Sequence, residues 1–140
     1  MKSDRSTSSN AANAPIDWSR VRRVLFIRLR SIGDTVLMTP CLQALNDWQP
    51  SVEISVVTEP PAAPVLEGHS LVDQLFVTGN GLSSRLSLAA RLRSQAFDIA
   101  FNLHGGSTAM LLTAMSGAKH TFGFRGQRGS WLLAERAPGP

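Results

Sequence analysis

The chain has 140 residues, of which 43% are hydrophobic, and this length and composition predict one domain with an ordinary core. The 14 Lys and Arg residues exceed the 10 Asp and Glu residues, and the arginines are spread from Arg5 to Arg136. Because the basic residues form no block, the charge favours a solvated basic surface and argues against a nucleic-acid-binding stripe.

The first residues of the chain are rich in Ser, Asn and Ala and lack the apolar core of a signal peptide. We therefore expect a disordered tail over residues 1–20, one ordered domain over residues 21–140, and a cytoplasmic location. No apolar run approaches the roughly 18 residues that span a bilayer, so any membrane contact is expected to be peripheral. Cys41, the only cysteine, lies among apolar residues, which predicts a small buried side chain and excludes an internal disulfide.

The first predicted strand is the β-branched and aromatic run over residues 24–29, which a Ser-Ile-Gly-Asp turn follows. From Asp34 onward the apolar residues take a helical spacing. Thr39 and Pro40 fit an N-cap and a first helical position, which predicts that this helix kinks or restarts at Pro40. A second strand is predicted over residues 52–58.

A proline-rich stretch over residues 59–64 interrupts regular structure before the remaining elements. Ser107 is predicted to cap the last helix, which is apolar almost all round and is therefore expected to be buried. We expect residues 137–140 to be irregular. The remaining predicted elements are strands over residues 74–78, 98–103 and 120–124 and helices over residues 82–95 and 107–115.

The alternation of strands and helices predicts a Rossmann-like α/β fold, a doubly wound parallel sheet with helices on both faces. In the strand order 3-2-1-4-5, the first and fourth strands are neighbours and the connections after them diverge to opposite faces. Ligands of such folds bind in the crevice that this divergence leaves at the carboxyl ends of the strands. The loops that would flank the crevice are residues 30–34 and 104–107.

The first loop carries charged side chains. A carboxylate at Asp34, where the loop meets its helix, can act as a general base toward a substrate hydroxyl. Asp is also a common helix N-cap, so the residues alone leave open whether Asp34 is a base or a cap. Arg28 and Arg30 could grip an acidic acceptor group, or they could simply be solvated.

The second loop offers backbone amides at the start of a helix. Such amides bind phosphate or carboxylate oxygens, with His104 as a nearby donor. Paired glycines such as Gly105 and Gly106 also occur where only a tight turn is needed, so both interpretations stay open.

Motifs for nucleotide or metal binding are missing from the chain. The first loop lacks a complete Gly-x-Gly-x-x-Gly pattern, and no P-loop pattern occurs. The three histidines lack paired ligand spacing, so no metal site is expected.

Two segments resemble a known family. Residues 28–40, Arg-Leu-Arg-Ser-Ile-Gly-Asp-Thr-Val-Leu-Met-Thr-Pro, resemble the opening signature of glycosyltransferase family nine, the bacterial heptosyltransferases. Residues 97–106, Phe-Asp-Ile-Ala-Phe-Asn-Leu-His-Gly-Gly, are similar to the second N-terminal landmark of the family, with Asn102 in place of the Asp of many relatives. The resemblance runs from Arg23 to the C-terminus.

This resemblance implies the N-terminal, acceptor-side half of a two-domain GT-B glycosyltransferase. The implied reaction is inverting transfer of heptose from ADP-heptose to the lipopolysaccharide inner core, at the inner face of the inner membrane, without a cofactor or a required metal. The donor would be held mainly by a C-terminal domain that we expect to be absent from this chain, so the chain alone is expected to be inactive. The resemblance implies that Asp34 is the catalytic base. The residues expected to bind substrate are Arg28, Arg30, Ser31, Gly33, His104, Gly105 and Gly106.

Two other functions compete with this one. The same crevice could belong to a non-enzymatic α/β domain that binds a phosphorylated or nucleotide ligand, with Asp34 only as a cap. A dinucleotide-dependent oxidoreductase would need a complete glycine fingerprint, of which the first loop supplies one glycine. A reading frame that continues past Pro140 for about 100–200 residues would favour the transferase.

Overall fold

The structure, a computed structural model, describes residues 15–124 and 135–137. The strands form one parallel sheet of six in the order β3-β2-β1-β4-β5-β6. They are β1 (Arg23–Ile27), β2 (Glu53–Thr58), β3 (Gln74–Val77), β4 (Ile99–Asn102), β5 (His120–Phe124) and β6 (Glu135–Ala137). The helices are the 3-10 helix η1 (Trp18–Arg20), α1 (Ile32–Trp48), α2 (Ala63–Leu66), α3 (Leu82–Ser94) and α4 (Ser107–Met115). The predicted fold class and the order of the first five strands are confirmed.

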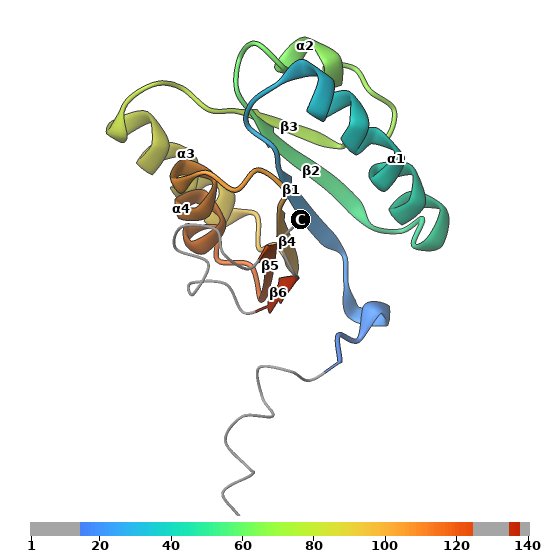
Figure 1. Cartoon of the computed structure of the whole chain (residues 1–140). Coiled ribbons are helices and arrows are strands. Elements are labelled where there is room, and N and C mark those ends of the chain that lie inside the picture. The colour runs from blue at the N-terminus through green and yellow to red at the C-terminus, as the bar shows by residue number, and fades with distance from the viewer. Residues whose placement is uncertain (1–14, 125–134, 138–140) are drawn as a thin grey trace, which may run out of the picture.

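Helices cover both faces of the sheet. The chain winds outward from β1 to β3 through α1 and α2, which lie on one face, and then returns to the centre and winds the other way through α3 and α4, which lie on the opposite face (Figure 1). This arrangement follows from the right-handedness of crossover connections between parallel strands. It leaves β1 and β4 side by side at the centre, where the winding reverses.

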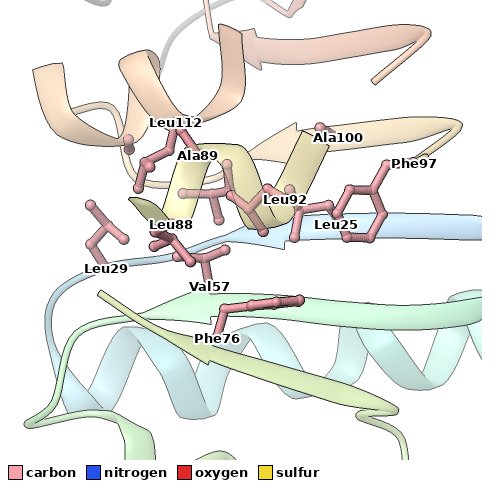
Figure 2. Packing of buried hydrophobic residues seen from close by; sticks show 12 residues of the cluster. Leu25, Leu29, Val57, Phe76, Leu88, Ala89, Leu92, Phe97, Ala100 and Leu112 are labelled. Atoms are coloured by element: carbon pink, nitrogen blue, oxygen red, sulfur yellow. The ribbon is translucent and has the colours of Figure 1, made fainter. Parts of the chain in front are cut away.

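The core has two layers because β1 is apolar on both of its faces. Leu25 and Ile27 pack toward α3 and α4, whereas Val24 and Phe26 pack toward α1. Figure 2 shows the first layer, in which leucines of α3 and α4 lie over the side chains of the central strands. A continuous apolar run therefore marks a strand that is buried on both sides.

Helix α1 does not restart at Pro40, which was one of the two outcomes predicted there. It runs without a break from Ile32 to Trp48 with Pro40 inside it. Proline lacks the N–H that would bond the carbonyl four residues earlier. That carbonyl belongs to Val36, and the hydroxyl of Thr39 donates to it at 2.7 Å. The Thr-Pro pair thus replaces the lost bond instead of starting a new helix.

Three other local predictions are wrong. Cys41 is exposed, because the buried side of α1 is formed by its neighbours Met38, Leu42 and Leu45. Gly106, not Ser107, is the N-cap of α4, and no side chain caps this helix. Leu111 of α4 is 36% exposed, so α4 is buried on one side only.

The ends of the chain differ in part from the expectation. Residues 18–20, inside the range predicted as a tail, form η1, and Trp18 packs on Trp48 of α1 with ring centroids 4.7 Å apart. Residues 1–14 of that predicted tail lie outside the described residues. Strand β6 was not predicted. Its last residue, Ala137, begins the stretch expected to be irregular, and residues 138–140 lie outside the described ones.

Within the described ranges, none of the helices combines the length and the apolarity that crossing a bilayer requires.

One carboxylate links the start of β1 to the start of its neighbour β4. Asp98, just before β4, accepts hydrogen bonds from the backbone N–H groups of Arg22 at 2.8 Å and Arg23 at 3.0 Å. Its other oxygen pairs with the ammonium of Lys119 at 3.2 Å. Burial opposes the charge of Asp98, but these hydrogen bonds and the ammonium outweigh it and lower the pKa of the carboxyl below its usual 3.8. The ionised form is therefore the one that the fold prefers.

We expect Asp98→Asn to lower the free energy of unfolding at pH 7 by about 1.5–3 kcal/mol, the range for hydrogen bonds to a charged group. Because the folded-state pKa is depressed, the contribution of Asp98 is present above the unfolded-state value and is lost as the pH falls through the folded-state value. Urea titrations of both proteins from pH 7 to pH 3 measure this. Asp47→Asn, an exposed carboxylate that bonds only Gln43, is the control. Equal stability of the Asp98 and Asp47 variants would contradict the prediction.

Candidate functional site

The two loops that the sequence singles out meet at one edge of the sheet. In the β1–β4 pair Ile27 lies opposite Asn102, and the N–H of Leu103 donates to the carbonyl of Ile27 at 3.0 Å. From this point the chain leaves β1 toward α1 and leaves β4 toward α4, on opposite sides of the sheet (Figure 1). Both loops therefore lie at the edge of the sheet where ligands of doubly wound folds bind.

Ser31, not Asp34, caps α1. The helix begins at Ile32, and the Ser31 hydroxyl oxygen accepts from the N–H of Asp34 at 3.4 Å. Ser31 adopts a φ of 71°, which is uncommon for a residue with a side chain. Its carbonyl also accepts from the hydroxyl of Thr35 at 2.9 Å. The cap interpretation of Asp34 is therefore wrong, and the Asp34 carboxylate is left for another task.

That carboxylate forms an ion pair with Arg28. The guanidinium of Arg28 lies 2.6 Å from the nearer Asp34 oxygen, and the two side chains are 21% and 46% exposed. A second nitrogen of the same guanidinium donates to the carbonyl of Leu103 in the other loop. Arg28 thus bridges both loops and fixes the direction of the Asp34 carboxylate.

The neighbouring residues of the first loop are more open. The guanidinium of Arg30 is 75% exposed and lies 3.6 Å from a carboxylate oxygen of Glu59, which follows β2. At Gly33 an added Cβ would meet only the Ser31 hydroxyl, at 3.9 Å, so the fold itself does not require a glycine there. The space beside Gly33 is open to a ligand.

The second loop is a tight turn whose glycines have conformational reasons. The side-chain amide oxygen of the buried Asn102 accepts from the backbone N–H groups of His104 at 3.1 Å and Gly105 at 3.3 Å. Gly105 has a φ of 90°, which side chains rarely adopt. A Cβ on Gly106 would lie 3.1 Å from the His104 ring. Asn102, a departure from the family pattern, therefore shapes the turn that places His104.

His104 faces the charged cluster. Its Nδ1 is buried and has no hydrogen-bond partner within the described residues. Burial, followed by the charges of Arg28 and Arg30, lowers the pKa of the His104 imidazole below the usual 6.5. The carboxylates of Glu59 and Asp34 act in the opposite direction without reversing the shift. His104 is therefore neutral at pH 7 and can both donate and accept a hydrogen bond.

A scan for metal sites in residues 15–124 and 135–137 finds no group of three or more His, Cys, Asp or Glu side chains that could hold an ion.

Comparison with solved structures identifies the relatives of this fold. A family 9 glycosyl transferase from Veillonella parvula superposes with a TM-score of 0.69 and 27% sequence identity over 74% of this chain. The chain is glycosyltransferase-like. ADP-heptose lps heptosyltransferase II of E. coli, with a TM-score of 0.73 and 23% identity over 84% of the chain, shares the fold. So does E. coli heptosyltransferase WaaC, solved with ADP-2-deoxy-2-fluoro heptose, with a TM-score of 0.72 and 17% identity over 83% of the chain.

These neighbours are much longer than the glycosyltransferase-like chain, which covers 32%, 35% and 42% of their respective lengths. Scans against protein-family models and curated protein sequences give no significant match. The resemblance to family nine that residues 28–40 and 97–106 indicate is confirmed by the structural comparison.

Sequence reasoning missed one member of the charged cluster. Glu59 of the glycosyltransferase-like chain, which pairs with Arg30, follows the carboxyl end of β2 directly. Since β2 is the neighbour of β1, an acidic residue at this position lies at the same sheet edge as the first loop. The predicted strand order could therefore have identified Glu59 as a neighbour of the first loop.

We expect the stability of the chain to fall between pH 7 and pH 5 in part because of His104. A histidine with a depressed folded-state pKa resists protonation, so the unfolded state binds the proton first and stability decreases as the pH falls below about 6.5. The His104 ring signals in an NMR titration should change at a pH below that value.

His104→Gln should flatten the pH dependence of the urea midpoint, and His120→Gln, at the half-buried start of β5, should retain it. A His104 imidazole that titrates above 6.5 would show that the positive neighbours do not act on it as the geometry indicates.

Proposed function

We propose that this chain is the acceptor-side domain of an inverting glycosyltransferase that moves heptose from ADP-heptose to the inner core of lipopolysaccharide. The Arg28–Asp34 ion pair at the crevice carries this proposal. It provides a carboxylate that does not cap α1 and that a guanidinium orients. This carboxylate lies at the edge of the sheet where ligands of doubly wound folds bind. The heptosyltransferases among the structural neighbours support the choice of sugar.

In this mechanism the Asp34 carboxylate accepts the proton of an acceptor hydroxyl. The freed oxygen forms a bond to the anomeric carbon of the donor sugar, on the face opposite the leaving group. The bond from that carbon to the phosphate oxygen breaks, ADP leaves with the electron pair, and the configuration of the carbon is inverted. The chain supplies the base and the acceptor surface, whereas the donor is held mainly by a second domain.

The other residues of the two loops surround the reacting hydroxyl in this proposal. Ser31 and Gly33 border the Asp34 side of the crevice, and the turn of His104 to Gly106 borders the other. A neutral His104 can hydrogen-bond an acceptor hydroxyl without adding charge. The reaction needs no cofactor or metal ion, and it takes place at the cytoplasmic face of the inner membrane, where the protein binds peripherally.

The test is a transfer assay with a protein that continues past Pro140 through a second domain. Incubation with ADP-heptose and heptose-free inner core should give a product heavier by one heptose in mass spectrometry. Purified residues 1–140 should give none, because the donor contacts are missing. Transfer only from a different sugar nucleotide would change the proposed donor. Ligand binding without transfer from any sugar nucleotide would favour the non-enzymatic alternative.

A further inference from the structure

A cavity lies at the same edge of the sheet as the two loops, beside Glu59. It has a volume of about 320 Å³, within the size range of small-ligand sites. Its walls come from the loop after β2, the loop after β3 and the first turns of α3 and α4. The lining residues are Glu59, Pro60, Pro61, Thr78, Gly79, Asn80, Arg85 and Thr108.

Arg85 is the cation on the wall of this cavity. Its side chain is half-buried and has no ion pair or hydrogen bond to any described residue, and its Nε is fully buried without a partner. Arginines near the crevice are bound differently, since Arg28 pairs with Asp34 and Arg30 pairs with Glu59. Its Nε–H group is withdrawn from water without an acceptor, which is costly, whereas the rest of this half-buried guanidinium is open to an acceptor in the cavity.

The local backbone keeps Arg85 at the wall. A Cβ on Gly79 would lie 2.3 Å from the hydroxyl oxygen of Ser84 and 3.2 Å from its Cβ. The loop after β3 therefore lies close against the first turn of α3, and a side chain at Gly79 would make the Ser84 side chain shift.

The charges around the cavity define the ligand. Among the described residues that line the cavity, Glu59 supplies the only carboxylate, and the Arg30 guanidinium balances it at 3.6 Å. Arg85 therefore leaves the cavity with one net positive charge. Asn80 and Thr108 add neutral groups that can donate hydrogen bonds.

We propose that this cavity binds a single anionic group, a phosphate or a carboxylate, through the guanidinium of Arg85. The negative charge of the Glu59 carboxylate on the cavity wall disfavours a ligand group with a larger negative charge. This binding is separate from the proposed transfer reaction and does not require a donor domain, so it can fail or succeed independently of that proposal.

The experiment is an NMR titration of the 140-residue chain with sodium phosphate and, separately, with sodium acetate. Sodium chloride holds the ionic strength constant, because surface charges respond to salt alone. We expect saturable shifts of the Arg85 Nε–H signal and of the amides of Gly79, Asn80 and Thr108. A response to phosphate alone assigns the site to phosphate groups, a response to acetate alone assigns it to carboxylates, and a response to both supports the shared chemistry.

Arg85→Gln should weaken this binding about 10- to 100-fold, the factor for one charge-assisted hydrogen bond. Arg93→Gln removes the same charge from the exposed last turn of α3 and should leave the binding unchanged. Asn80→Asp leaves Arg85 intact, adds a negative charge at the exposed rim and should weaken binding even if the Arg85 variant fails to fold. Absence of a saturable response to both anions, or equal affinity in the Arg85 and Arg93 variants, overturns the proposal.

Discussion

Under the proposed mechanism, Asp34→Asn in a protein that continues past Pro140 through a donor domain is expected to lower the turnover number by about 10²- to 10⁴-fold, the contribution of a positioned general base. The amide keeps the size of the carboxylate and can still contact Arg28, but it cannot take a proton from the acceptor hydroxyl. Donor and acceptor KM should change little, because the loss falls on the proton transfer. Initial rates at saturating donor measure the effect.

The structure also provides a stability control for the Asp34→Asn experiment. Because the Ser31 hydroxyl caps α1, Asp34→Asn should leave the thermal midpoint nearly unchanged. Ser31→Ala should lower the stability by about 0.5–2 kcal/mol, as loss of an N-cap does. Near-normal turnover of a well-folded Asp34→Asn enzyme would remove this carboxylate from the mechanism.

Arg28→Gln is expected to lower kcat by about 10²-fold, as a misplacement of a reacting group by about 1 Å does. Arg28 is bound to Asp34 and to the carbonyl of Leu103, so its loss frees the carboxylate and separates the two loops. Arg28→Lys should recover part of the activity. The Lys ammonium can pair with Asp34, but it lacks the second nitrogen with which the guanidinium also bonds the carbonyl of Leu103.

Two roles of Arg28 can be distinguished by whether its substitution changes kcat or the acceptor KM. If its guanidinium positions Asp34, kcat falls and the acceptor KM stays nearly constant. If it grips an acidic group of the acceptor, the acceptor KM rises and kcat is retained. Arg93→Gln, the same charge change on the exposed end of α3, is the control for net charge.

The sheet could be predicted from the sequence because its signals are repetitive. The run over residues 24–27 is apolar at every position, as a central parallel strand must be, and β2, β4 and β5 each follow a segment of helical spacing. Strand β6 could not be predicted in the same way. It has three residues, Glu135–Ala137, two of them charged, and its pairing with β5 is a tertiary contact.

The site was predictable in its position and less so in its contacts. Parallel topology places the loops after residues 29 and 103 at one edge, whatever their side chains do. The choice between Ser31 and Asp34 as the cap depended on the φ of Ser31, which no pattern in the sequence encodes. The Arg28–Asp34 pair likewise depends on how two side chains turn toward one another across the loop.

The proline in α1 creates a local weak point in the backbone ladder of that helix, within two turns of Asp34. A continuous ladder of backbone bonds makes a helix open as a whole, but at Pro40 one rung is a side-chain bond from Thr39. The turns over residues 32–39, which carry Asp34, are held on the core by Thr35 and Met38, both of which are buried, and the rung at Pro40 is the one that opens most easily. Amide hydrogen exchange should be faster for residues 36–39 than for residues 42–46. In the proposed mechanism the Asp34 carboxylate therefore stands on a helix end that two buried side chains anchor and that one weaker rung joins to the rest of α1.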